Sequence, residues 1–174
     1  MKLKIKVKRL SGTIKLPRII EKGDWIDLTS AKEVEINAPT AGTLRGKEST
    51  KRDVTSEVVY VPLGVAIQLP KGFEAIVAPR SSTAKNIGVI MANSIGIIDN
   101  TYCGNNDQWH FPAIGIRKTV IPINTRLCQF RIQLSQKANM IQKLKWILSS
   151  GIELEEVDNL KSVDRKGLGK GTGK

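Results

Sequence analysis

A carboxylate stands where an apolar strand should end. In the stretch NSIGIIDNTYCGNNDQW, residues 93–109, the apolar run stops at Asp99 and is followed by Tyr102, Cys103 and Gly104. A carboxylate fixed at the end of a strand can take a proton from water, which is the task of a general base. An aspartate in such a place can also begin the turn DNTY through its own backbone hydrogen bonds. The stretch alone leaves both interpretations open.

A second segment has the composition of a phosphate-binding site. In PRSSTAK, residues 79–85, Arg80 offers a charged fork and Ser81 a hydroxyl, and N–H groups at the start of a short helix suit phosphate oxygens. From Ser82 to Lys85 the segment also matches the SxxK pattern of acyl-transferring serine enzymes. The companion SDN motif is absent, so this interpretation is the weaker one.

The segment RKGLGKGTGK, residues 165–174, combines glycines with positive charge. Glycines let backbone N–H groups approach phosphate oxygens, and Arg165 can meet a terminal phosphate. The segment is not a Walker A loop, because the position five before Gly173 is Leu168. We expect residues 164–174 to be mobile until a ligand binds them.

Charge and composition narrow the class of partner. The chain has 28 basic and 16 acidic residues and a formal charge of +12, which favours an anionic partner. Aromatic residues make up only 5%, too few for base-stacking platforms, so we do not expect direct nucleic-acid binding. The one histidine, His110, excludes the usual zinc sites and leaves a hard cation on oxygen ligands if a metal takes part. Cys103 and Cys128 lack CxxC spacing and are expected to be reduced.

The length and the apolar runs indicate a soluble protein. At 174 residues the chain is expected to form one core. It has no run of about 18 apolar residues, and MKLKIKVKRL alternates charge with hydrophobe where a signal peptide has an unbroken apolar stretch. We therefore expect a cytoplasmic location and no membrane partner.

Strand patterns dominate the chain. In residues 2–10, Leu3, Ile5 and Val7 alternate with lysines, the period-2 signature of a half-buried strand. Further runs bounded by Gly, Pro, Asn and Asp predict strands over residues 57–69, 73–79, 87–99, 108–116, 118–123 and 126–134. Many short strands with brief turns indicate an all-β fold: a sandwich, a jelly roll or a barrel.

Other segments fall outside the strand pattern. Residues 81–86 predict a short helical turn, residues 139–150 fit either helix or strand, and residues 38–56 read as a long surface loop. Together with the glycine-rich arm, this organisation predicts a β domain over residues 1–163 followed by the arm over residues 164–174.

The order and spacing of four segments resemble the trimeric dUTP pyrophosphatases (dUTPases). The segments are VPLGVAIQLPKGFEAIVAPRSSTAKNIGVI, NSIGIIDNTYCGN, NTRLCQF and DRKGLGKGTGK. The resemblance implies a jelly-roll or distorted β-barrel subunit with very little helix. It also implies a Mg²⁺-dependent hydrolase that converts dUTP to dUMP and pyrophosphate by water attack on the α-phosphate. The enzyme would be a homotrimer whose sites are shared between chains.

The resemblance assigns the base and sugar residues. Asp99 would be the general base, and Tyr102 would pack beneath the deoxyribose and leave no room for a 2′-hydroxyl. Asn93 would read the uracil edge, since an amide matches both a donor and an acceptor, with Gly96 and Ile98 in the same pocket. Leu168 stands where relatives place an aromatic residue that stacks on uracil.

The resemblance also assigns the phosphate and metal residues. Gln129 in RLCQF would bind the phosphate chain, although by alternation it also fits an outward polar residue of a strand that shares a face with Leu127. Asp27 in GDWIDL would contact Mg²⁺ through water. The full set of expected phosphate ligands is Arg80, Ser81, Ser82, Gln129, Arg165, Gly169, Lys170, Gly171 and Thr172.

Departures from the family pattern are local. Ser82 and Thr83 stand where relatives often have Gly and then Leu, and Trp25 stands where a small residue is usual. Two other functions are carried as alternatives: a dCTP deaminase of similar fold, and a regulatory protein of the same fold that binds dUTP. Deamination needs a glutamate at the base, and the glutamates after Ala75 lie outside the motifs, at positions 153, 155 and 156.

Overall fold

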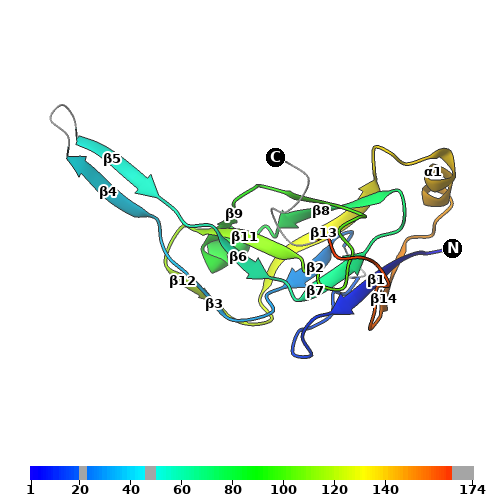
Figure 1. The fold of residues 1–174 in the computed structure, drawn as a ribbon. Helices are drawn as coiled ribbons and strands as arrows, with labels where there is room; N and C mark the ends of the chain where they lie inside the picture. Colours follow the sequence, from blue (N-terminus) through cyan, green and yellow to red (C-terminus); the bar gives the residue numbers. More distant parts are fainter. Residues whose placement is uncertain (20–22, 46–49, 166–174) are drawn as a thin grey trace.

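Short alternating runs broken by Gly, Pro and Asn fold into short strands (Figure 1). The computed structural model describes residues 1–19, 23–45 and 50–165. The strands are β1 (Leu3–Arg9), β2 (Ile26–Thr29), β3 (Val34–Ile36), β4 (Thr40–Arg45), β5 (Thr50–Thr55), β6 (Val59–Pro62), β7 (Val65–Gln68), β8 (Phe73–Pro79), β9 (Val89–Met91), β10 (Gly96–Asp99), β11 (His110–Gly115), β12 (Thr119–Ile121), β13 (Arg126–Leu134) and β14 (Ile152–Glu156). The helical elements are a π-turn η1 (Thr83–Ile87) and the helix α1 (Met140–Ile147). The predicted all-β class with very little helix is confirmed.

A four-stranded antiparallel sheet in the order β10-β8-β13-β2 runs through the body. Its centre is the pairing of β8 with β13, from Phe73 opposite Leu134 to Pro79 opposite Cys128. Alternation along β8 turns Phe73, Ala75 and Val77 into the core. Strand β8 therefore has β10 beside its first half, and η1 begins shortly after its last residue.

The other sheets close the core around this one. Their strand orders are β14-β1-β7, β6-β11-β9, β12-β3 and β4-β5. As predicted, Leu3, Ile5 and Val7 of β1 are buried between outward lysines. Aromatic side chains fill the centre, where Trp109 meets Phe130 edge to face at 5.2 Å between ring centroids.

Two predicted strands are interrupted in the structure. The run 57–69 divides into β6 and β7 at Gly64, whose φ is +69°; a Cβ there would also crowd Ile14 and Ala31. The run 87–99 divides into β9 and β10, with Ser94 at φ +61° between them. Each break lets the chain change sheets, which a continuous strand would prevent.

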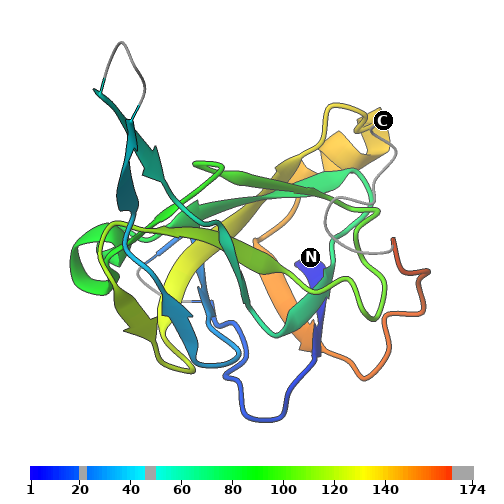
Figure 2. The same cartoon turned by 60° about the vertical axis from the view of Figure 1, so that its left-hand side comes forward.

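The surface loop expected over residues 38–56 was a wrong prediction. It contains strands β4 and β5, which pair from Thr40 opposite Thr55 to Arg45 opposite Thr50. This ribbon projects from the body in both views (Figure 1 and Figure 2). Its strands lack a clear apolar alternation, so the pattern that identifies buried strands did not reveal them.

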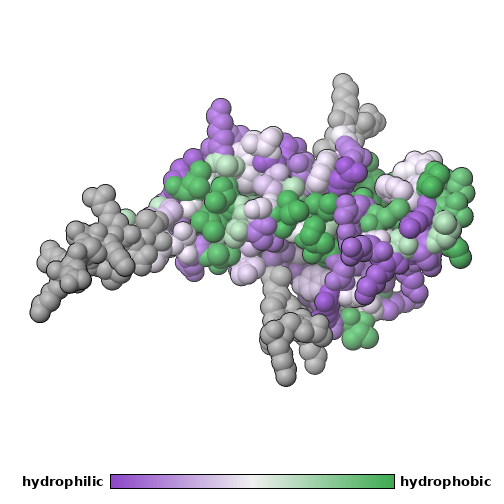
Figure 3. All heavy atoms as spheres, turned by 90° about the horizontal axis from the view of Figure 1, so that it is seen from above, coloured by the Kyte–Doolittle hydropathy of each residue, from purple (hydrophilic) through white to green (hydrophobic). Residues whose placement is uncertain are grey.

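The ambiguous segment 139–150 is mainly helical. Asn139 begins α1 with a capping box, in which its side chain and that of Gln142 accept from each other's backbone N–H groups. Trp146 packs on Phe73 with ring centroids 5.4 Å apart. The outer face leaves Met140, Ile141, Leu144, Ile147 and Leu148 exposed. These residues belong to the apolar surface at the α1 end of Figure 3. In the described part of the chain no helix is long and apolar enough to span a membrane.

Candidate active site

The register of β10 places Asp99 at the edge of the central sheet. Gly96 pairs with Val77 and Asp99 with Glu74, so β10 runs back along the first half of β8. The Asp99 side chain is half exposed, at 49%. The backbone of Asp99 begins a turn, because its carbonyl oxygen accepts from the N–H of Tyr102 at 3.2 Å. Asp99 therefore begins a turn and also remains accessible for chemistry.

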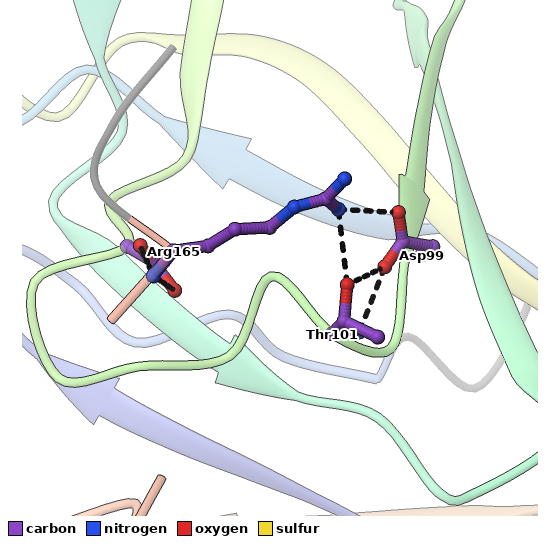
Figure 4. A network of polar contacts seen from close by, with 4 residues as sticks. Asp99, Thr101 and Arg165 are labelled. Carbon is purple, nitrogen blue, oxygen red and sulfur yellow. Dashed lines mark hydrogen bonds and ion pairs between the residues drawn. The ribbon is translucent and has the colours of Figure 1, made fainter. Parts of the chain in front are cut away.

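Three side chains form a polar network at Asp99 (Figure 4). Carboxylate Oδ1 accepts from the backbone N–H of Thr101 at 2.8 Å and from the Thr101 hydroxyl. Carboxylate Oδ2 accepts from Nη1 of Arg165 at 2.6 Å, and the same Nη1 donates to Thr101 Oγ1 at 3.0 Å. Sequence reasoning missed Thr101. An Asp-x-Thr spacing at the start of a turn is the signal that would have indicated it.

The network changes the ionisation of Asp99. Partial burial by itself would raise the pKa of this carboxyl. Hydrogen bonds from Thr101 and Arg165, together with the charge of Arg165, outweigh burial and hold the pKa below its ordinary value. Asp99 is therefore ionised at neutral pH, as a proton acceptor must be.

A cavity of about 490 Å³ opens beside this network. Its lining brings together the residues predicted to bind a base and a sugar, namely Asn93, Gly96, Ile98 and Tyr102, with Asp99 and Arg165. Residues from other sheets complete the wall, including Tyr60 of β6 and His110 of β11, which the sequence analysis did not assign to the site. The volume lies within the range of small-molecule sites.

Tyr102 is fixed in the wall of this cavity by its hydroxyl. The Tyr102 O–H donates to the backbone carbonyl of Gln108 at 3.0 Å. Burial, and to a smaller extent the charge of Asp107, raise the pKa of Tyr102, so the phenol stays protonated. The Tyr102 ring is half-buried, and hydrogen bonds hold both its hydroxyl and its backbone N–H. It is therefore suited to restrict the shape of a ligand.

A larger hollow of about 1140 Å³ lies next to the first. Asp99 and Arg165 line both hollows. Lysines from several segments also line the larger one; they are Lys4, Lys6, Lys71 and Lys137. This concentration of positive charge favours the approach of anions to the site.

The predicted phosphate ligands gather at the far end of β8. Gln129 lies between Ala78 of β8 and Asp27 of β2 in the sheet. Arg80 follows β8 directly, and its Nε lies 2.9 Å from Oδ1 of Asp27. The order of the strands therefore joins residues from positions 27, 80 and 129 into one group, here called the Arg80 cluster.

The π-turn completes this end of the sheet. The predicted helical turn over residues 81–86 is confirmed as η1, with Ser82 at its N-cap. Ser81 is exposed beside it. Thr83 is buried, and its hydroxyl donates to the carbonyl of Leu127 at 2.6 Å. This bond satisfies the buried hydroxyl and ties η1 to β13.

The two groups of residues are far apart within one chain. Asp99 lies opposite Glu74, whereas Arg80 follows the last residue of β8. Six strand positions at roughly 3.3 Å each separate Glu74 from Arg80 by about 20 Å. The backbone of Asp99 and that of the Arg80 cluster therefore lie at opposite ends of β8.

The described residues do not fit a dedicated metal centre. Both carboxylate oxygens of Asp27 are engaged, Oδ1 by Arg80 and Oδ2 by Nη1 of Arg126 at 3.2 Å. Across residues 1–19, 23–45 and 50–165 there is no group of three or more acidic, His or Cys side chains arranged to hold a cation. The remaining predicted arm residues, Leu168, Gly169, Lys170, Gly171 and Thr172, lie outside the described residues.

A small all-β fold, a cavity ending at an ionised carboxylate and an adjoining hollow lined by lysines are the arrangement expected of an enzyme acting on an anionic ligand. The profile of the dUTPase family matches residues 47–172. The chain belongs to the dUTPase family, and the predicted family and jelly-roll fold are confirmed.

Individual relatives agree with this assignment. The SPbeta prophage-derived deoxyuridine 5'-triphosphate nucleotidohydrolase YosS of Bacillus subtilis strain 168 is 43% identical over 167 residues, 96% of each chain. A mutant dUTPase of Staphylococcus bacteriophage 80alpha, solved with dUpNHpp, has a TM-score of 0.58 and 15% identity over 78% of this chain and 93% of its own. A mutant dUTPase of phage phi11 of S. aureus, whose structure describes a structural Mg(II) ion, has a TM-score of 0.60 and 15% identity over 78% and 94%.

Proposed function

We propose that this chain is a cytoplasmic dUTP diphosphatase that hydrolyses dUTP to dUMP and pyrophosphate, with Asp99 as the general base. The observation that supports this role is the position of Asp99 at the mouth of a cavity that also contains Asn93, Gly96, Ile98 and Tyr102. The 43% identical relative is named for the same activity.

The chemical step follows from the acceptor position of Asp99. The carboxylate takes a proton from a water molecule while the water oxygen attacks the α-phosphorus. The bond from the α-phosphorus to the oxygen that bridges to the β-phosphate breaks, and pyrophosphate leaves with the bond's electron pair. Asp99 then returns the proton to solvent.

Arg165 has two roles in this scheme. Without substrate, its guanidinium occupies Oδ2 of Asp99 and, together with Thr101, lowers the pKa of the carboxyl. When a triphosphate enters, its denser negative charge attracts the guanidinium, which moves to the phosphates and leaves Oδ2 free for water. The rest of the arm, residues 166–174, would close over the ligand with its backbone N–H groups.

Residues in the wall of the cavity would select the base and the sugar of the substrate. Asn93 would pair with the uracil edge from the turn between β9 and β10, and a C5 methyl group would collide with the wall of the pocket there. Tyr102, held by Gln108, would block a 2′-hydroxyl. Leu168 would cover the uracil as an apolar contact without aromatic stacking.

A homotrimer would bring residues of neighbouring chains together in one active site. Because Asp99 and the Arg80 cluster are about 20 Å apart along β8, the phosphate ligands of a site would come from a neighbouring chain. Light scattering at micromolar concentration should give a mass of three times 19.2 kDa. A monomer with full activity would contradict shared sites.

Mg²⁺ remains the expected cofactor, as in the phi11 relative, although no step above depends on it. It would neutralise charge on the triphosphate. Since Asp27 is paired with Arg80 and Arg126, its role toward Mg²⁺ stays a hypothesis of indirect contact through water. Chelation by EDTA followed by addition of Mg²⁺ tests this dependence.

Product analysis separates the candidate functions. The purified protein is incubated with dUTP, dCTP, dTTP or UTP, and pyrophosphate and ammonia are measured. Pyrophosphate from dUTP alone supports the proposal, whereas ammonia from dCTP indicates a deaminase. The structure gives the deaminase little support, because Glu153, Glu155 and Glu156 lie on or at the end of β14 and do not line the cavity. Binding of dUTP without product indicates the regulatory alternative.

A further inference from the structure

One side of α1 is apolar and exposed. Successive residues of a helix are turned by about 100°, so the residues three or four positions from Leu144 lie within about 60° of it around the helix. These residues are Met140, Ile141, Ile147 and Leu148. All five are between 49% and 75% exposed, and together they are here called the α1 face.

The opposite side of α1 attaches the helix to the body. Gln142 and Trp146 lie on that side, two positions before and after Leu144. The ring of Trp146 packs on Phe73. The Gln142 side chain lies so close to Gly72 that an added Cβ there would collide with it. The α1 face is therefore directed outwards, at one end of the molecule (Figure 1 and Figure 3).

Lysines border the α1 face on both sides. Lys143 and Lys145 stand next to Leu144 in the sequence, so each lies about 100° around the helix from it, in opposite directions. Both are exposed, as is Lys137 just before the helix. Residues 136–150 contain no acidic residue. The α1 face with its border of lysines therefore fits an apolar surface that carries negative charge.

The composition of the α1 face favours a lipid surface over a protein partner. Protein interfaces are enriched in aromatic residues and Arg and depleted in Lys, and they take about 20–30 residues from each partner. The α1 face has five apolar residues and a border of three lysines, whereas the aromatic residue of the helix, Trp146, faces inwards. In helices that lie on membranes, apolar residues enter the boundary between headgroups and acyl chains, and lysines reach the headgroups.

We propose that the α1 face binds peripherally to a membrane rich in anionic lipids, with Lys143 and Lys145 at the headgroup phosphates. The formal charge of +12 adds to this attraction. The expectation of no membrane partner rests on the lack of an apolar run long enough to span a bilayer, and a helix that lies in the plane of the surface needs no such run. With eight residues, α1 would lie on the membrane and not cross it.

Sedimentation with vesicles tests this binding. The probes are vesicles of phosphatidylcholine alone and vesicles that also contain phosphatidylglycerol, an anionic lipid. The wild-type protein should sediment with the second kind at low ionic strength, less so as salt is added, and only weakly with the first kind. The double variant Leu144→Ser, Ile147→Ser should have a partition coefficient lower by about tenfold or more, because binding follows the apolar area that is buried. Absence of binding by the wild-type protein would overturn the proposal.

Matched variants locate the contact. The double variant Ile116→Ser, Val120→Ser removes exposed apolar residues from another part of the surface and should bind as the wild type does. Lys143→Gln with Lys145→Gln should weaken binding and its dependence on salt, whereas Lys143→Arg with Lys145→Arg keeps both charges and should retain it. Equal binding by the two serine variants would place the contact elsewhere and overturn the proposal.

A labelled cysteine gives a second measurement that does not depend on a loss of binding. Cys103 and Cys128 are buried, so a thiol introduced by Ile147→Cys can be labelled selectively with an environment-sensitive fluorophore. Its emission should shift to the blue when phosphatidylglycerol vesicles are added, whereas the same label introduced through Val120→Cys should not respond. A label at position 147 that does not shift overturns the proposal. A shift that follows protein concentration without lipid also overturns it, because it assigns the α1 face to contact between copies of the chain.

Discussion

Nη1 of Arg165 lies 2.6 Å from Oδ2 of Asp99, although the two residues are 66 positions apart in the chain. The contact joins the end of β10 to the root of the arm. Together with Thr101 it lowers the pKa of the proposed base, and it places a cation where the phosphates of a substrate would arrive. The effects of changing this pair and its neighbours follow from these two properties.

Asp99→Asn removes the proton acceptor and keeps the size of the side chain. We expect binding of a non-hydrolysable dUTP analogue to persist, while the rate of hydrolysis falls by a factor on the order of 10² or more. Calorimetry and pyrophosphate release measure the two effects. Asp158→Asn, at an exposed acid outside both cavities, is the control and should behave as wild type. Near-normal turnover in the Asp99 variant would remove this residue from the mechanism.

Thr101→Val should change the pH dependence of the reaction. The variant loses the hydroxyl that donates to Asp99 and helps to keep the pKa of that carboxyl low. The pKa of Asp99 then rises, so a larger fraction is protonated in mild acid and the acidic limb of kcat/KM moves to higher pH. Thr101→Ser retains the donor and should keep the wild-type profile. An unmoved limb in the valine variant would show that Thr101 does not tune the base.

Tyr102→Ala should weaken the distinction between dUTP and UTP. Loss of the ring opens space beside the sugar, and we expect kcat/KM for UTP relative to dUTP to rise about tenfold or more. Tyr102→Phe keeps the ring and loses only the hydrogen bond to Gln108, so it should retain most of the discrimination. Equal discrimination in all three proteins would place the sugar elsewhere.

Two truncations separate Arg165 from the glycines that follow it. Removal of residues 166–174 leaves Arg165 in place, whereas removal of residues 165–174 also eliminates the contact with Asp99. Both proteins should fold, as judged by thermal unfolding, and both should lose activity. The longer deletion should cost more, because such charge stabilisation contributes several kcal/mol at sites of this kind. Full activity in both would show that the arm takes no part.

Leu168→Phe tests the position where relatives stack an aromatic residue on uracil. The variant should be active and bind dUTP tighter by about 0.5–1.5 kcal/mol, the range for an added aromatic pair. Affinity for the non-hydrolysable analogue measures the change. A loss of activity would mean that another residue already covers the uracil face.

Local patterns in the sequence predicted the all-β class and the segments that carry the site. Alternation in β1 and β8 and apolar runs that end at turn residues are periodic over a few positions, so they can be read without knowledge of partners. These local patterns did not predict the break at Gly64 or the ribbon of β4 and β5. A break depends on what packs against the turn, and the strands of the ribbon lack a clear apolar alternation in the sequence.

The sequence by itself determined which residues have the chemistry for a nucleotide site, including Asp99, Tyr102 and Arg80, because residue type and short spacing carry that information. Only the tertiary structure decided how they are grouped. The antiparallel register puts Asp99 and Arg80 at opposite ends of β8, and the Asp107 carboxylate, which accepts from the backbone N–H of Arg165, holds Arg165 beside Asp99. The contacts of Thr101 with Asp99 and of Asp107 with Arg165 were likewise revealed only by the structure. Such groupings arise from pairings between distant segments, whose energies depend on the whole packed core and leave no periodic signal in the chain.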